Sequence, residues 1–241
     1  LLNDFTNMRC ALPDAPAPSA ESYPGGIDRS RWHMQQGIEV FERCFHARPQ
    51  GVWLSEGGIS ADALDILEEF DIRWTASGEG VWENCCLQAP DSGKSAAADS
   101  AQLRRRLFKP HRYRNGGTRL FFRDDGLSDM IGFEYQRWAP EDAARNFTQN
   151  LENIAEFLGE DAERHVVSII LDGENAWEHY PDNAHHFLQA LYPELSSNPR
   201  IRLSTFSEMA AQLQADNFDH ICPGRWIYGS FSTWIGEKDR N

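Results

Sequence analysis

Apolar residues form two recurring patterns along the chain, short apolar runs and longer segments with helical spacing. Between 140 and 158 they recur every three or four positions after a proline, which predicts an amphipathic helix. β-Branched or aromatic runs that end in a polar turn predict strands. The predicted strands are 51–54, 72–75, 118–122, 166–171 and 201–204. The predicted helices are 31–47, 61–70, 140–158, 184–191 and one after the capping box of 205–208.

The connections between these elements also have recognisable compositions. A serine side chain can accept a hydrogen bond from a first-turn N–H group, so Ser30 and Ser60 are predicted N-caps. Residues 13–26 are rich in proline and glycine and predict a loop. Residues 90–102 consist mainly of Asp, Ser, Gly, Lys and Ala, which predicts a flexible surface insertion.

Strands that alternate with helices are typical of parallel βαβ units. In this chain the polar residues follow the carboxyl end of each informative strand, and in such folds that end carries the functional site. The sequence therefore predicts an α/β fold with parallel strands, and it contains no internal repeat.

The stretch 166–180 has the most informative pattern. An apolar run typical of a strand buried on both faces changes within two residues to Asp172 and Glu174. Trp177, His179 and Tyr180 follow and add aromatic and titratable groups. A solvated acidic turn is the alternative, but turns seldom combine Trp, His and Tyr with two acids. This stretch therefore predicts carboxylates delivered to a pocket by a rigid strand.

A second carboxylate follows a short apolar run at 51–54. Trp53 lies in that run, and Glu56 is followed by Gly57 and Gly58, which let a ligand or backbone approach without meeting a Cβ. An exposed loop acid is the alternative interpretation, and this pattern alone does not decide between them. The aromatic residues near the end of the chain are equally open to two interpretations, core packing or stacking on sugars. They are Trp226, Tyr228, Phe231 and Trp234.

Length and charge narrow the class of protein. A chain of 241 residues can form one domain, and its net charge of −14 argues against binding to nucleic-acid phosphates. The basic cluster at 104–114 is interpreted as a solvated face. Membrane-length apolar runs and a signal peptide are both absent from the sequence. Five cysteines without C-x-x-C spacing suit a reducing cytosol, so a cytoplasmic location is expected.

Two acids on separate strand ends with tryptophans nearby suit glycoside chemistry. One carboxyl group protonates the leaving oxygen and the other stabilises the oxocarbenium-like centre. A metal site is the main alternative, because Asp and His residues are frequent near the strand ends, although H-E-x-x-H and H-x-H spacings are absent. A serine nucleophile is disfavoured because no G-x-S-x-G motif is present. The candidate metal ligands are Asp124, Asp125, Asp129, His179, His185 and His186.

Two motifs resemble those of one enzyme family. The block 51–60 (Gly-Val-Trp-Leu-Ser-Glu-Gly-Gly-Ile-Ser) is similar to the G-x-W-x-x-E block of glycoside hydrolase family 57. The block 171–180 (Leu-Asp-Gly-Glu-Asn-Ala-Trp-Glu-His-Tyr) resembles that family's D-G-E-N-x-W-E block. The segments 121–133 and 234–238 are similar to others in its α-amylase/α-mannosidase-like branch.

This resemblance implies a mechanism and a fold. It makes Glu56 the catalytic nucleophile and Asp172 the general acid/base. It implies an incomplete (β/α)7-type barrel and a retaining hydrolase or transglycosylase that acts on α-glucans without an organic cofactor. The two carboxyl groups are then expected about 5–5.5 Å apart. The expected sugar contacts are Trp53, Asp125, Glu174, Trp177 and His179.

The sequence departs from the family pattern in two places. The family's early histidine-containing block has no match, and its C-terminal helical region is absent after Asn241. The chain also lacks an initiator methionine. We therefore expect residues 1–241 to be the central part of a catalytic barrel, with an aromatic segment at about 222–241 that leads to the helical region. A metal-dependent deacetylase or mannosidase on a related barrel, or a non-catalytic carbohydrate-binding relative, remains the alternative.

Overall fold

The computed structural model describes residues 24–87, 100–174 and 176–231. Its strands form a five-stranded sheet in the order β1-β2-β4-β3-β5. Three of the four strand pairings are parallel, and β3 runs antiparallel to β4. The strands are β1 (Gly51–Val52), β2 (Trp74–Ser77), β3 (His111–Tyr113), β4 (Arg119–Phe122) and β5 (Asp216–Phe218). The expected α/β class is thus found, with a mostly parallel sheet.

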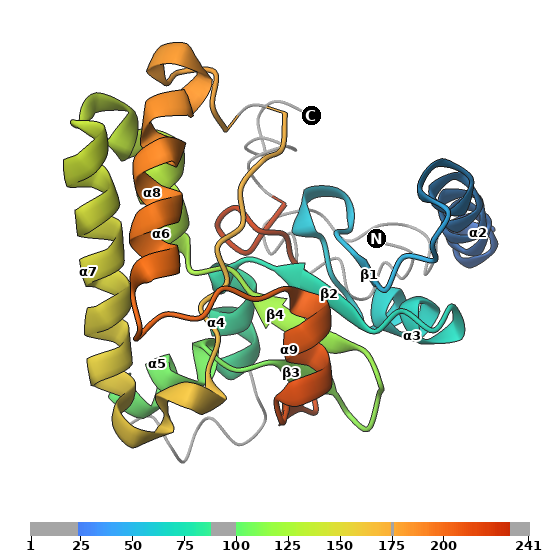
Figure 1. The fold of residues 1–241 in the computed structure, drawn as a ribbon. Coiled ribbons are helices and arrows are strands. Elements are labelled where there is room, and N and C mark those ends of the chain that lie inside the picture. The colour runs from blue at the N-terminus through green and yellow to red at the C-terminus, as the bar shows by residue number, and fades with distance from the viewer. Residues whose placement is uncertain (1–23, 88–99, 175, 232–241) are drawn as a thin grey trace, which may run out of the picture.

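Some helices pack on the two faces of this sheet, and others lie to its sides (Figure 1). The α-helices are α2 (Gly26–Phe45), α3 (Ala61–Glu69), α4 (Glu79–Leu87), α5 (Ser100–Leu107), α6 (Asp125–Asp129), α7 (Pro140–Leu158), α8 (His185–Ser197) and α9 (Phe206–Gln212). Short 3-10 or π turns are η1 (Ser55–Gly57), η3 (Met130–Glu134), η4 (Tyr135–Arg137), η5 (Gly159–Arg164) and η6 (Pro181–Ala184). The helices α7 and α8 lie side by side, away from the sheet (Figure 1). Within the described residues, no helix has the length and apolar character needed to cross a bilayer.

Strand β4 is buried on both faces because its side chains alternate between two apolar clusters. Leu120 and Phe122 pack in the largest cluster, together with residues of α3, α4 and α5. Phe121 packs on the other face with Ala76 and with Met209 of α9. A separate cluster joins α7 and α8. The sheet is therefore a rigid central layer from which loops can present polar side chains.

The three parallel strands β1, β2 and β4 end at the same edge of the sheet. Glu56 follows β1, Glu79 follows β2, and Arg123 with Asp125 follows β4. Hydrogen bonds join these turns, because Ser77 Oγ donates to Gly57 O over 2.6 Å and Asp125 N donates to Glu79 Oε2 over 3.1 Å. The turns that follow β1, β2 and β4 are thus joined at one edge of the sheet.

The run 166–171 is not a regular strand, which corrects the sequence prediction. It lies extended beside the end of β4, where Ser168 forms an isolated parallel bridge with Arg123. Its backbone makes two hydrogen bonds to other backbone groups, from Val166 N to Phe108 O over 2.7 Å and from Asp124 N to Ser168 O over 2.9 Å, and two more to side chains. Arg123 Nε donates to Ile170 O over 2.9 Å, and Ile170 N donates to Ser128 Oγ over 3.3 Å. Beyond the Ser168 bridge, side chains of the neighbouring turn bind the backbone of Ile170 where a regular strand partner would do so.

The structure confirms three predictions about individual elements and their caps and corrects two others. The helix 140–158 is confirmed as α7, Ser60 caps α3, and Thr205 and Glu208 form the capping box of α9. Ser30 is not an N-cap, because α2 begins at Gly26 and Ser30 Oγ donates to Gly26 O. The residues 201–204 form no strand.

The expected insertion at 90–102 can be compared with the structure only at its last three residues, and the basic cluster at 104–114 differs in part from its interpretation. Residues 88–99 lie outside the described residues, but 100–102 begin α5. The basic cluster is solvated only in part: Arg114 is exposed, but other members are paired or buried. Arg104 pairs with Glu79 and Asp124, Arg106 pairs with Asp216, and the His111 side chain is fully buried. Carboxylates on neighbouring elements, of which Asp124 is buried, thus bind cations that the sequence pattern assigned to solvent.

Candidate active site

Glu56 lies in a backbone conformation that is uncommon for residues other than glycine. Its φ angle is 59°, and that of the following Gly57 is 57°. The short β1 strand ends four residues earlier, and the η1 turn redirects the chain toward the sheet edge. Trp226 N donates to Glu56 O over 3.1 Å, so a distant segment stabilises this turn. A non-glycine residue held at positive φ is a feature that clusters at functional sites.

The carboxylate of Glu56 is bound through one oxygen. Arg225 Nη1 lies 3.1 Å from Glu56 Oε2, and Trp226 Nε1 donates to the same oxygen over 3.2 Å. The Arg225 side chain is fully buried, whereas the Glu56 side chain is 42% exposed. Burial lowers the pKa of Arg225, and the charge of Glu56 opposes that effect. The carboxylate thus faces solvent on one side and a buried cation on the other.

Two tryptophans flank this carboxylate. Trp53 and Trp226 meet edge to face, with ring centroids 5.3 Å apart. Trp53 keeps 38% of its surface exposed, and Trp226 is half-buried. An exposed aromatic face beside a carboxylate offers a stacking surface for an apolar sugar face.

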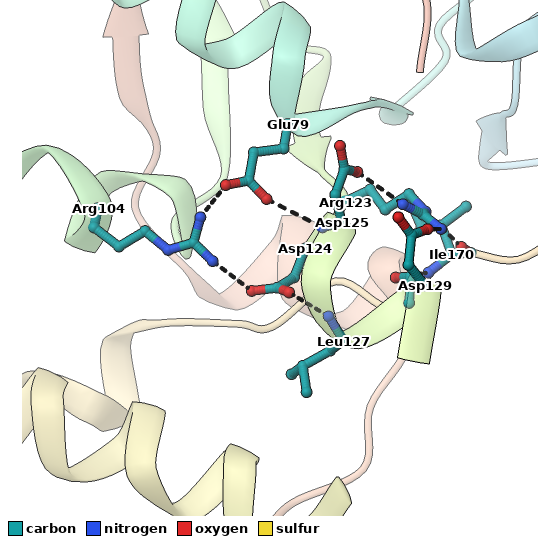
Figure 2. A network of polar contacts seen from close by, with 9 residues as sticks. Glu79, Arg104, Arg123, Asp124, Asp125, Leu127, Asp129 and Ile170 are labelled. Carbon is teal, nitrogen blue, oxygen red and sulfur yellow. Dashed lines mark hydrogen bonds and ion pairs between the residues drawn. The ribbon is translucent and has the colours of Figure 1, made fainter. Parts of the chain in front are cut away.

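Arg123 connects the Glu56 region to the run that leads into Asp172. Its guanidinium carbon lies 5.4 Å from the centre of the Trp226 ring, and its Nε donates to Ile170 O. Figure 2 shows the same guanidinium pairing with Asp125 and Asp129, at 2.9 and 2.6 Å. Asp172 itself is half-buried, two residues beyond Ile170. The contacts therefore form a chain from Glu56 through Trp226 and Arg123 to the segment that carries Asp172.

The other expected sugar contacts after Asp172 have different surroundings. Glu174 is exposed, and exposed His179 pairs with Glu178 over 3.4 Å. Trp177 packs against Tyr180, with ring centroids 5.7 Å apart, at the border of the α7–α8 cluster. Within the part of the chain that the structure describes, these three side chains form no hydrogen bond, ion pair or ring contact with Glu56. Their role in sugar binding stays a prediction.

A second polar network holds the ends of β2 and β4 together. Figure 2 shows Arg104 between Glu79 and Asp124, both of which it binds. Asp124 Oδ1 also accepts the Leu127 N–H over 2.8 Å and caps α6. Burial raises the pKa of Glu79 and of Asp125, and the neighbouring arginines Arg104 and Arg123 oppose the rise. Asp125 therefore lies in the site with its carboxylate already paired with Arg123.

The candidate metal ligands do not converge. Asp124, Asp125 and Asp129 bind arginines, as described above, and His186 pairs with Asp182 over 3.0 Å. Across residues 24–87, 100–174 and 176–231, His, Cys, Asp and Glu side chains form no group of three or more that could hold a metal ion.

Sequence reasoning missed Arg225 and Arg123 and left Trp226 undecided between core and site. Arg225 is 169 positions from the carboxylate that it binds, and no local pattern announces that pairing. The signal that was available is a single arginine between Pro-Gly and an aromatic run, which is an unusual place for a solvated cation.

Comparisons with known proteins place this geometry in context. The sequence profile of Glycosyl hydrolase family 57 matches residues 22–221. Three solved structures share the fold at TM-scores of 0.62–0.63. The 4-alpha-glucanotransferase of Thermococcus litoralis is 17% identical, and the match covers 90% of this chain and 29% of that one. The alpha-amylase of Thermotoga maritima is 15% identical, with 88% and 49% covered. The GH57-type branching enzyme of Pyrococcus horikoshii is 16% identical, with 86% and 46% covered.

The chain thus spans less than half the length of each of these solved structures. A comparison with curated proteins gave no match. The profile match includes both Glu56 and Asp172 and covers most of the chain, so this protein belongs to glycosyl hydrolase family 57.

Proposed function

We propose that this chain carries the catalytic acids of a retaining glycoside hydrolase or transglycosylase that acts on α-glucans. Glu56 is the nucleophile and Asp172 is the general acid/base. The observation that carries the proposal is the carboxylate of Glu56, a residue at positive φ, which Arg225 and Trp226 bind and which is still 42% exposed beside Trp53. A carboxylate that is anchored, accessible and carried by a strained turn is suited to attack a substrate.

The substrate class is supported by the structural neighbours. They are named as a 4-alpha-glucanotransferase, an alpha-amylase and branching enzymes. The exposed ring of Trp53 is suited to stacking on a glucose unit, and Asp125, Glu174, Trp177 and His179 remain proposed sugar contacts. The expected incomplete (β/α)7 barrel and the cytoplasmic location also stay proposals.

The reaction proceeds in two balanced steps. In the first step, Glu56 attacks the anomeric carbon, the bond to the leaving oxygen breaks, and Asp172 gives its proton to that oxygen. The result is a glycosyl ester on Glu56 and an ionised Asp172. In the second step, water or a sugar hydroxyl attacks the anomeric carbon, its proton passes to Asp172, and Glu56 leaves as a carboxylate. Water gives hydrolysis, and a sugar hydroxyl gives transglycosylation.

The test uses the full chain with maltooligosaccharides and amylose, and follows the product anomer by NMR. The wild type is expected to give net retention. The Glu56→Gln and Asp172→Asn variants are expected to lose several orders of magnitude in rate, because each removes one partner of the two-carboxylate mechanism. Wild-type turnover by either variant would remove that residue from the mechanism. Binding of maltooligosaccharide without turnover would favour the non-catalytic carbohydrate-binding alternative.

A further inference from the structure

Arg225 is a buried cation whose carboxylate partner is the proposed nucleophile. A guanidinium removed from water is strongly destabilising unless an anion and hydrogen-bond acceptors surround it. Arg225 Nη1 lies 3.1 Å from Glu56 Oε2, and its Nε donates to Ser230 O over 2.9 Å. The second bond fixes the plane of the guanidinium, so its position relative to Glu56 is set by the loop that carries it.

That loop is fixed to the turn of Glu56 and to the end of β2. Gly224 and Ile59 exchange backbone hydrogen bonds at 2.9 and 3.2 Å. A Cβ at Gly78 would lie 2.3 Å from Trp226 O, and one at Gly80 would lie 2.8 Å from Gly229 N. The backbones approach this closely only because both positions are glycine. These contacts fix the position of the loop, and therefore of Arg225, relative to Glu56.

The two donors select one oxygen of the carboxylate. Arg225 and Trp226 both bind Oε2. Across the described ranges of the chain, Oε1 accepts no hydrogen bond. The anchored oxygen is thus defined, and the other oxygen is the one that can bond to a substrate.

We propose that Arg225 is a positioning residue that anchors Glu56 through Oε2, directs Oε1 to the anomeric carbon, and favours the return of Glu56 as a carboxylate when the glycosyl ester breaks down. This inference rests on the proposed function. It assigns different effects to the two chemical steps, and the experiment below separates them.

The charge of Arg225 acts in opposite directions on the two steps. In the first step, Glu56 loses its negative charge as it forms the ester, so a neighbouring cation stabilises the starting carboxylate. In the second step, water attacks the anomeric carbon, Asp172 takes its proton, and the electron pair of the broken C–O bond returns to Oε1. The negative charge then reappears beside Arg225, which stabilises that transition state relative to the ester.

The experiment uses the full chain and a 4-nitrophenyl α-maltooligoside, whose good leaving group makes the first step fast. For Arg225→Met we expect kcat to fall about 10²-fold, the effect typical of losing one charge-stabilising donor. KM should fall as well, so that kcat/KM changes by less than about 10-fold. One equivalent of nitrophenolate should appear in a burst, and mass spectrometry should find the glycosyl group on Glu56.

Two further variants separate charge from orientation. Arg225→Lys keeps a cation and should recover part of kcat and reduce the burst. Trp226→Phe removes the second donor to Oε2 but no charge, so kcat and kcat/KM should fall together without a burst. Circular dichroism and thermal unfolding identify any variant that fails to fold, and the remaining variants then decide the question.

The outcomes also distinguish this inference from the proposed function. If Glu56→Gln loses activity while Arg225→Met keeps wild-type kcat and KM, the inference alone is wrong. The same holds if a folded Arg225→Met loses kcat and kcat/KM equally and shows no burst. If Glu56→Gln keeps its activity, or the wild type neither turns over the probe nor forms a glycosyl ester, both the inference and the proposed function are wrong.

Discussion

At the scale of single residues, the site depends on a turn that two neighbouring positive-φ residues make. Glu56 has the side chain that the proposed chemistry needs, and Gly57 has the space that the turn needs. A Cβ at Gly57 would lie 2.6 Å from the Trp53 ring and 3.0 Å from Trp226 Cβ. The glycine therefore lets both tryptophans close around the carboxylate.

We expect Gly57→Ala to lower the free energy of unfolding by roughly 1–3 kcal/mol, from left-handed backbone strain alone, and to displace Trp53. The matched control is Gly37→Ala, at an open helical position of α2 where nothing lies within 4 Å of the added Cβ. That change should raise stability by about 0.5–1 kcal/mol, because alanine is the better helix former. Urea denaturation measures both. An equal effect of the two changes would contradict the role assigned to Gly57.

The candidate carboxylate was predictable from local sequence, but its anchors were not. Glu56 follows an apolar run and precedes two glycines, and both features are visible within ten residues. Arg225 becomes informative only when folding brings it to Glu56, because an isolated arginine carries no sign of its partner. The positive φ of Glu56 was also hidden, since glutamate does not favour it and tertiary contacts impose it.

At the scale of elements, the ends of β2 and β4 are joined by an arginine from α5. Arg104 binds Glu79, whose side chain is 14% exposed, and Asp124, whose side chain is 3% exposed. These carboxylates position the turn that carries Arg123 and Asp125. The helix α5 therefore orders the sheet edge where the proposed site lies.

We expect Arg104→Met to cost about 2–4 kcal/mol of unfolding free energy, because it leaves two poorly solvated carboxylates without their cation. Arg145→Met is the matched control, since Arg145 pairs with Asp142 on the surface of α7 with both side chains about 60% exposed. A surface pair of that kind contributes about 0–1 kcal/mol. Chemical denaturation near pH 7 measures the difference. A loss at Arg104 no larger than at Arg145 would show that the network does not stabilise the fold.

Elements with strong periodicity were the most predictable. The helix 140–158 has a proline at its start and a continuous apolar stripe, and α7 matches it at both ends. The run 166–171 has the composition of a strand, but Arg123 and Ser128 bind its backbone, so composition predicted the extended conformation and not the pairing. The short strands β3 and β5 were missed because they are polar and three residues long.

At the scale of the whole molecule, the sheet combines a parallel half that carries the site with a reversed half that closes the core. The strands β3 and β5 complete the sheet beyond β4, and His111 of β3 lies at the centre of that half. Its ring stacks on Phe218 with centroids 4.5 Å apart and meets Phe122 at 5.4 Å. A titratable ring in such an apolar place links the stability of the entire fold to pH.

Burial lowers the pKa of His111 from 6.5 to about 4, and the charges of Arg106 and Lys109 act in the same direction, against the Arg106 carbonyl and Asp216. Between these two pKa values, His111 is protonated in the unfolded chain and neutral in the folded protein. The stability from neutral His111 is therefore fully present above pH 6.5 and is lost as pH falls toward 4, by up to roughly 3 kcal/mol.

The variant His111→Gln can still bond to the Arg106 carbonyl but cannot titrate, so its unfolding free energy should fall less over that range. Urea denaturation at half-unit pH steps measures this, with exposed His33→Gln as the control, and parallel pH curves for wild type and His111→Gln would refute the assignment.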